Sequence, residues 1–133
     1  MLLLISSFSE WALLILRLVF GAIFLAHGWP KIKNLRANAQ NFEMMGFKPG
    51  AFWGTIVAFA EFFGSLAIMV GLGTQVAGLV LAFNMLIAAS WKITKNQKLV
   101  GGFELDITLL AVGLILATFG GGTYALDSFY PLY

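Results

Sequence analysis

The sequence contains no cysteine and a single histidine. Without a thiol the chain has no disulfide exchange, no thiolate nucleophile and no cysteine ligand for an iron–sulfur cluster. A haem held by two side chains would need an axial partner for His27, and no residue is marked out for that role. Histidine and carboxylates nowhere recur at metal-ligand spacing, so we expect no metal site. The chain by itself is therefore not expected to be a redox centre.

Charge is scarce as well. Only 11% of the 133 residues are charged and 60% are hydrophobic, and the mean hydropathy is +0.91. Soluble domains have about 25% charged residues, and one this small could not hide so much apolar surface. The net charge of +2 forms no basic stripe, so a nucleic-acid partner is not expected. The length suits a single domain, residues 1–133, whose solvent is the lipid bilayer.

The apolar residues gather into runs long enough to cross a bilayer, which takes about 20 residues for about 30 Å of hydrocarbon. Tryptophans fall near the ends of these runs, where their rings suit the headgroup region. Glycines at 71, 73 and 120–122 separate or end the later runs. We therefore predict an all-α membrane protein, a bundle of four transmembrane helices at about Phe8–Trp29, Phe52–Leu72, Gln75–Trp91 and Phe103–Phe119.

Lysine and arginine are confined to the first and third connections, apart from Arg17 inside the first apolar run. The second connection and both termini have none. Because such residues favour the cytoplasmic side, we expect both basic connections in the cytoplasm and both termini outside. The expected location is a bacterial or archaeal cell membrane. The basic residues are Lys31, Lys33, Arg36 and Lys48 in the first connection and Lys92, Lys95 and Lys98 in the third.

The first connection, residues 30–51, has a helical pattern of its own. Apolar residues recur at helical spacing with polar residues between them, and Gly46 and Pro49 follow. This predicts a short amphipathic cytoplasmic helix between the first two transmembrane helices. Such a helix can lie in the membrane interface or fold back over the bundle as a lid, and the pattern fits both. The apolar positions are Ile32, Leu35, Ala39, Phe42 and Met45.

Two ionisable residues lie deep in the apolar runs: Arg17 in the first and Glu61 in the second. A buried guanidinium calls for a carboxylate, so we predict that the two meet near the bilayer midplane. The pair could fix helix packing and register, or it could bind or protonate a polar ligand. Asn84 in the third run is expected to form an interhelical hydrogen bond or to contribute to a polar site.

Further polar residues are expected near the cytoplasmic ends. His27 and Lys31 share one flank of the first helix, and Glu104 and Asp106 open the fourth. Carboxylates in a first turn suit the helix dipole, but pointing Glu104 at lipid would be costly, so we expect it to face the pocket side. The orientation of Asp106 is left open. Beside abundant phenylalanine, such a pocket would suit a flat, largely apolar ligand with polar carbonyls.

Several motifs together resemble the DoxX family over essentially the whole chain. They are Arg17 to Gly21, His27 to Lys31, Gly46 to Pro49, Glu61 to Gly64, Gly71 to Thr74, Gly101 to Glu104 and Gly120 to Asp127. The resemblance implies a four-helix membrane bundle associated with respiratory quinone chemistry. Members include a small subunit of a thiosulfate:quinone oxidoreductase and a membrane partner of thiol-stress and superoxide-defence enzymes. The matched position Asp127 is expected to cap the turn that contains it.

These observations lead to a functional prediction with alternatives. The first is a membrane subunit that binds a quinone or similar isoprenoid lipid and couples to a partner oxidoreductase at the cytoplasmic face. The second is a non-catalytic scaffold or assembly factor that anchors a soluble redox enzyme. A transporter or proton path, which would require a homo-oligomer, is a third. No catalytic residue is assigned, and the expected ligand-binding residues are Arg17, His27, Lys31, Glu61, Asn84 and Glu104.

Overall fold

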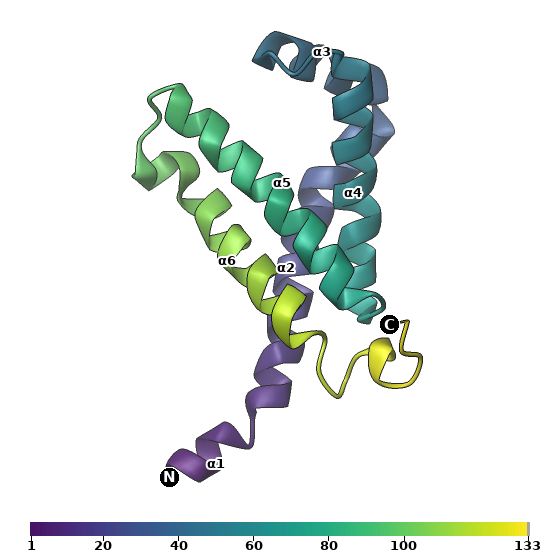
Figure 1. The fold of residues 1–133 in the computed structure, drawn as a ribbon, viewed down its shortest axis with the longest axis vertical. Coiled ribbons are helices and arrows are strands. Elements are labelled where there is room, and N and C mark those ends of the chain that lie inside the picture. The colour runs from purple at the N-terminus through teal and green to yellow at the C-terminus, as the bar shows by residue number, and fades with distance from the viewer. Residues whose placement is uncertain (133) are drawn as a thin grey trace.

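A computed structural model describes residues 1–132, and nearly all of the regular structure in them is α-helical (Figure 1). Four helices are long and apolar enough to cross a membrane, with α6 counted together with the turn that precedes it. The predicted all-α, four-helix membrane bundle is thus confirmed. The elements are α1 (Leu2–Ser6), α2 (Ser9–Lys33), α3 (Leu35–Met45), α4 (Gly50–Val70), α5 (Thr74–Thr94), a π-type turn η1 (Leu99–Phe103), α6 (Glu104–Phe119) and η2 (Leu126–Ser128).

The first transmembrane helix extends beyond its predicted end. It was expected to stop at Trp29, before Pro30, but α2 continues through Pro30 to Lys33. Proline removes one backbone donor and its ring crowds the carbonyl four residues earlier, and the helix ends within one turn of it. The carbonyl of Pro30 still accepts a hydrogen bond from the Asn34 amide at 3.2 Å, which closes the final turn.

The four long helices form two close pairs, α2 with α4 and α5 with α6, which spread apart toward one end of the molecule (Figure 1). Each pair approaches closely at glycine. A Cβ added to Gly28 of α2 would lie 2.8 Å from the Phe62 amide nitrogen, and one added to Gly113 of α6 would lie 2.9 Å from the Cβ of Ala82. Small residues at these positions let the backbones come together in lipid.

The hydrophobic core lies between the two pairs. Its buried members come from all four long helices. Many of the remaining large apolar side chains point outward and are exposed, as expected for a surface that meets lipid. The core is formed by Phe20, Phe24, Ile68, Leu81, Met85, Leu109 and Leu116.

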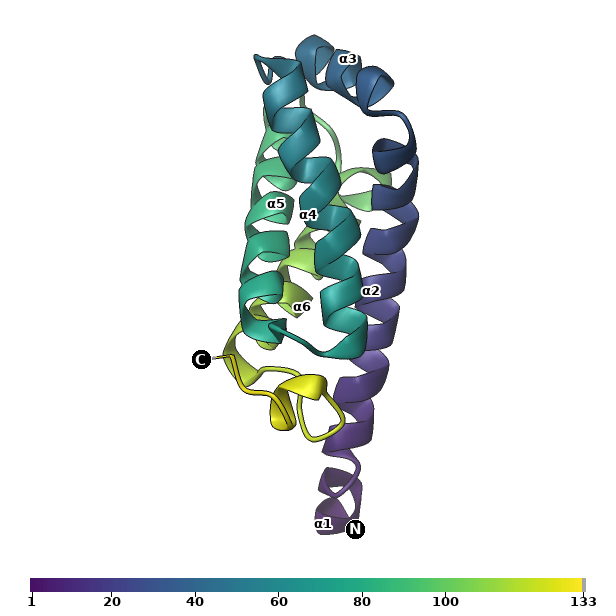
Figure 2. The same ribbon diagram turned by 90° about the vertical axis from the view of Figure 1, so that its right-hand side faces the viewer.

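The amphipathic helix α3 lies across the end at which the helix pairs spread, here called the α3 end (Figure 2). It folds back over the bundle. Asn38 of α3 donates a hydrogen bond to the Gly54 carbonyl at 2.7 Å, and the Trp91 indole nitrogen donates to the Met45 carbonyl at 3.0 Å. Gly46, with φ of +97°, ends α3 in the left-handed conformation that glycine adopts readily. The predicted helix is confirmed.

Both described ends of the chain lie at the opposite end, here called the terminal end (Figures 1 and 2). The segment after α6 folds back toward the turn between α4 and α5, where the Asp127 amide donates to the Gly71 carbonyl at 2.8 Å. The predicted glycine turn is present, with φ of +76° at Gly71 and +63° at Gly73.

Candidate functional site

Arg17 is bound by backbone carbonyls at the terminal end. Its guanidinium donates to the carbonyls of Ile68 at 3.0 Å and Met69 at 2.8 Å, in the last turn of α4. It also donates to Tyr124 at 3.1 Å and Gly121 at 3.3 Å, beyond α6. The side chain is 1% exposed. Arg17 thus joins three segments of the chain.

The predicted contact between Arg17 and Glu61 is therefore wrong. The last carbonyls of a helix have no partner within the helix and carry partial negative charge. They can satisfy a buried guanidinium without a carboxylate. Ile68 lies about two turns along α4 from Glu61, and Glu61 has other partners.

Two carboxylates complete the contacts at the terminal end. Asp127 accepts hydrogen bonds from the amides of Gly73 at 2.6 Å and Thr74 at 2.9 Å, so it caps the start of α5. Glu10 accepts from the Thr123 amide at 2.7 Å. We call Arg17, Asp127, Glu10 and their backbone partners the terminal clamp.

The surroundings of Asp127 favour its charged form. Burial alone would raise the pKa of this carboxyl. The hydrogen bonds from Thr74 and Gly73, together with the positive charge of Arg17, outweigh burial and hold the pKa below its ordinary value. The carboxylate is therefore a stable cap at neutral pH, where the N-terminal dipole of α5 also favours negative charge.

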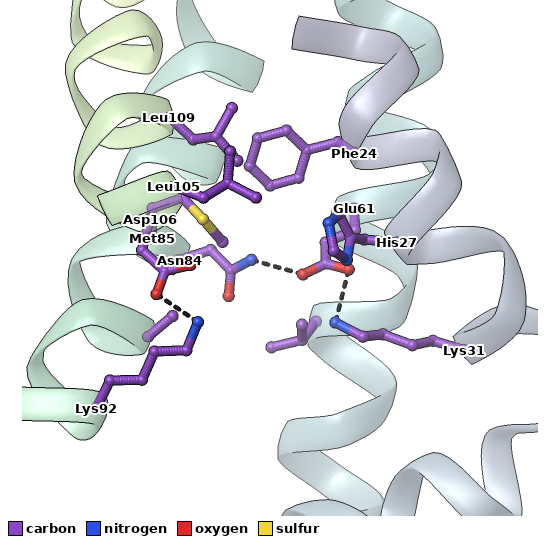
Figure 3. A pocket seen from close by; sticks show the side chains of 12 residues that line it. Phe24, His27, Lys31, Glu61, Asn84, Met85, Lys92, Leu105, Asp106 and Leu109 are labelled. Atoms are coloured by element: carbon purple, nitrogen blue, oxygen red, sulfur yellow. Dashed lines mark hydrogen bonds and ion pairs between the residues drawn. The ribbon is translucent and has the colours of Figure 1, made fainter. Parts of the chain in front are cut away.

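A polar cavity of about 220 Å³ lies between the helix pairs toward the α3 end (Figure 3). Glu61 of α4, 3% exposed, accepts from Lys31 Nζ at 2.7 Å and from Asn84 Nδ2 at 2.9 Å. Across the cavity, Lys92 Nζ of α5 lies 2.7 Å from Asp106 Oδ2 of α6. We call this the ionic cavity. It is lined by Phe24, His27, Lys31, Val57, Glu61, Asn84, Met85, Ala88, Lys92, Leu105, Asp106 and Leu109.

The carboxylate that α6 contributes to the cavity is Asp106, and the expectation that Glu104 faces the pocket is wrong. Glu104 is exposed and accepts from the Gly101 amide at 3.1 Å, which caps the turn before α6. Two residues of helix rotate a side chain by about 200°, so Glu104 and Asp106 cannot share a face. The lining residue Lys92, which had been assigned only to the basic connection, was also missed.

A signal for Asp106 was present in the sequence. It shares the buried face of α6 with Leu109, Gly113 and Leu116, at offsets of three, seven and ten residues. If Gly113 is taken to face the neighbouring helices, the helical period places Asp106 on the same inward face. Of the six expected ligand-binding residues, His27, Lys31, Glu61 and Asn84 line the cavity, whereas Arg17 and Glu104 lie outside its lining.

The charges in the ionic cavity balance within each helix pair. Lys31 and Glu61 pair between α2 and α4, and Lys92 and Asp106 pair between α5 and α6. The Asn84–Glu61 hydrogen bond joins one pair to the other. An anion would have to draw a lysine away from its carboxylate, so the arrangement favours an uncharged ligand with hydrogen-bonding groups.

A second, apolar pocket of about 300 Å³ lies beneath α3. It is rich in aromatic side chains, and the Phe42 and Phe47 rings lie 5.8 Å apart. It shares Val57, Asn84 and Ala88 with the ionic cavity. We call it the aromatic pocket, and its other lining residues are Phe42, Met45, Phe47, Trp53, Ile87 and Trp91.

Four apolar helices around a charge-paired cavity define a small integral membrane protein with an internal polar site. The model of one family, described as DoxX, matches residues 12–95, and the chain belongs to the DoxX family. It is 31% identical over 116 residues to the Bacillus subtilis (strain 168) protein named "Putative oxidoreductase CatD", covering 87% of this chain and 84% of that protein. It is 32% identical over 134 residues to the "Inner membrane protein YqjF" of Escherichia coli (strain K12), covering 92% and 94%. No solved structure matches the chain.

Proposed function

We propose that this protein is the membrane subunit of a quinone-linked redox system and that a quinone or similar isoprenoid lipid binds inside the bundle. The observation that carries the proposal is the ionic cavity, which lies between transmembrane helices, is rich in hydrogen-bonding groups and is balanced in charge. A quinone ring is flat, uncharged and bears two carbonyl acceptors. The name of the Bacillus subtilis relative supports a link to redox chemistry.

The residues of the cavity fit such a ring. His27, Lys31 and Lys92 carry nitrogen donors that can reach a carbonyl in the cavity, and Asn84 carries an amide. Phe24, Met85 and Leu109 supply apolar and polarisable walls. Arg17 has no part in this site, because its donors are occupied at the terminal clamp.

The carboxyl groups in the cavity can serve proton exchange. A bound quinone would supply a two-electron acceptor that also takes up two protons, with the electrons coming from a partner oxidoreductase. Glu61 and Asp106 are the carboxylates in the cavity, each held within 2.7 Å of a lysine nitrogen. Lys31 and Lys92 are about 30% exposed, which gives these pairs contact with solvent for proton exchange.

The proposed partner binds at the α3 end, which carries the exposed basic residues. Lys33, Arg36, Lys48, Lys95 and Lys98 are exposed there. By the positive-inside rule this end faces the cytoplasm and both termini face outward. A reduced cofactor of a cytoplasmic enzyme could then approach the end at which the helix pairs spread.

The experiment is mass spectrometry of organic extracts from gently purified protein, compared with extracts of the surrounding membrane. We expect a stoichiometric quinone or related isoprenoid with the wild type. The variant that combines Lys92→Met and Asp106→Leu should lose it, because it removes both members of a charged pair. Replacing both partners avoids leaving a lone buried charge, so the fold should persist.

The control is Lys95→Met, which removes one exposed positive charge near the same end and leaves the cavity lining unchanged. It should retain the quinone. The proposal fails if the wild type yields only bulk lipids in membrane proportions. It also fails if the double variant is folded and retains as much quinone as the control.

A non-catalytic scaffold is the second candidate, and the exposed basic connection favours it. Lys95 and Lys98 are exposed, whereas Lys92 belongs to the cavity. Reversing only Lys95 and Lys98 to glutamate should release an anchored acidic enzyme and leave ligand content unchanged. Loss of a co-purifying enzyme from a wild-type protein that contains no quinone would favour this function over the first.

A further inference from the structure

We propose that the aromatic pocket holds the apolar chain of the ligand whose headgroup occupies the ionic cavity, and that this chain leaves the protein between α4 and α5 beneath α3. The inference rests on the proposed function and adds to it the site that the apolar chain occupies and its route from the bilayer.

The first argument is continuity. The two spaces share Val57, Asn84 and Ala88 in their linings. Asn84 stands at the junction, with its amide nitrogen hydrogen-bonded to Glu61 on the cavity side. Ala88 is small, so a narrow molecule can pass it. A ligand that spans the junction would have its polar end among the ion pairs and its apolar end among aromatic rings.

The second argument is size. Ligand sites usually measure about 300–1,000 Å³. The ionic cavity, at about 220 Å³, falls below this range and suits a small ring alone. The aromatic pocket adds about 300 Å³ of mainly apolar space directly beside it. Only a ligand with a chain would use both.

The third argument is the direction in which the aromatic pocket faces. Its lining includes Trp53 of α4 and Ile87 of α5, which are 45% and 40% exposed on the outer surface of the bundle. These helices meet at the terminal end and diverge toward α3, and the pocket lies between them (Figure 1). The Trp91–Met45 hydrogen bond ties α3 to α5 above the pocket. The opening therefore faces outward from the bundle toward lipid, with α3 as its roof.

The free energy that the apolar chain adds to binding depends on the lipid that the chain leaves. Moving a chain from lipid into an apolar pocket gains little, because lipid tails are as apolar as the pocket walls. The aromatic pocket should therefore discriminate between ligands by whether their apolar chain fits, and it should add little to their affinity. With concentrations referred to the membrane, the wild type should bind a methyl-substituted benzoquinone and its decyl derivative with similar affinity.

The test is Ile87→Trp. It enlarges a side chain that lines the aromatic pocket and does not line the ionic cavity. Its matched control is Ile115→Trp on α6, where the isoleucine is 41% exposed and lines neither space. Bound benzoquinone in nanodiscs is measured by mass spectrometry. We expect Ile87→Trp to weaken binding of the decyl compound about tenfold while binding of the chainless compound changes less than about twofold. Ile115→Trp should change neither.

A photoreactive group at the end of the decyl chain gives a second measurement on the wild-type protein. Labelling at the residues of the aromatic pocket is expected. Labelling on α2 and α6 instead, or equal effects of Ile87→Trp on the two compounds, would overturn the inference and leave the proposed headgroup site standing. If neither compound binds the wild type, the proposed function and the inference both fail.

Discussion

The two ends of this bundle use their charged residues in opposite ways. At the terminal clamp, Arg17, Asp127 and Glu10 bond to backbone carbonyls and amides. At the α3 end, Lys31, Glu61, Lys92 and Asp106 bond mainly to side chains around a cavity, and Lys92 also donates to the Gly102 carbonyl at 3.4 Å. Backbone partners are fixed by the fold, whereas side-chain partners can rearrange when a ligand enters.

The comparison separates stability from binding. A charge bound to several backbone groups holds segments together and has few donors left for a ligand. A charge bound to one side chain in a cavity can exchange that partner for a ligand atom. We therefore expect the largest loss of stability for Arg17 at the terminal clamp, and the largest loss of ligand binding for substitutions in the ionic cavity.

The largest effect is expected for Arg17→Met. It leaves the carbonyls of Met69 and Tyr124 without the donor that Arg17 supplies. A buried hydrogen-bonding group left without its partner typically costs about 1–3 kcal/mol, and several such groups are left here. We expect a strongly lowered apparent Tm in detergent or failure to accumulate in the membrane. Unchanged thermal stability would contradict the structural role assigned to Arg17.

A smaller loss is expected at the second ion pair of the cavity. Asp106→Leu alone leaves Lys92 without its carboxylate, but Lys92 is part-exposed, so the cost should be only about 1–2 kcal/mol. Adding Lys92→Met should restore part of that stability. A double-mutant cycle from thermal unfolding measures the coupling. Purely additive losses would show that the two side chains do not interact.

Asp127→Asn tests the capping role at the terminal end. The folded-state pKa of Asp127 is lowered, so its charge stabilises the fold above the ordinary carboxyl pKa of about 3.8. That contribution is lost as pH falls through the lowered folded-state value. At neutral pH we expect Asp127→Asn to cost about 1 kcal/mol or less. Its apparent Tm should approach that of the wild type in acid. A constant difference across pH would contradict the assignment.

The smallest effect is expected for Glu104→Gln. Glu104 is exposed outside the cavity, so the change in stability should stay within about 0.5 kcal/mol. Quinone content should also match the wild type, in contrast to the Lys92 and Asp106 double variant. Loss of quinone in Glu104→Gln would show that this carboxylate, and not Asp106 alone, serves the site.

The sequence predicted the elements better than the contacts. Long apolar runs, tryptophans near their ends and turn glycines at 71, 73 and 120 located the transmembrane helices to within a few residues, because these signals are local. The periodicity of residues 32–45 likewise predicted α3. His27, Lys31, Glu61 and Asn84 were expected to be site residues, and the structure brings them together in one cavity.

The incorrect expectations concern contacts between elements. The partners of Arg17 are backbone carbonyls, which every residue has and which leave no mark in a sequence. Glu104 was expected to face the pocket because facing lipid is costly, and the orientation of Asp106 was left open; the register of the buried residues of α6 decides between the two. The aromatic pocket depends on where α3 folds, and its amphipathic pattern alone left that open.

The most direct test of the contrast between the two ends is a ligand-induced thermal shift with decyl-benzoquinone. A ligand that binds only the folded state stabilises it by about 2.7 kcal/mol at a hundred times its Kd. We expect a raised apparent Tm for the wild type, a full shift for the less stable Asp127→Asn variant, and none for Lys92→Met with Asp106→Leu. A full shift in the double variant, or its loss in Asp127→Asn alone, would contradict the division between a structural end and a binding end.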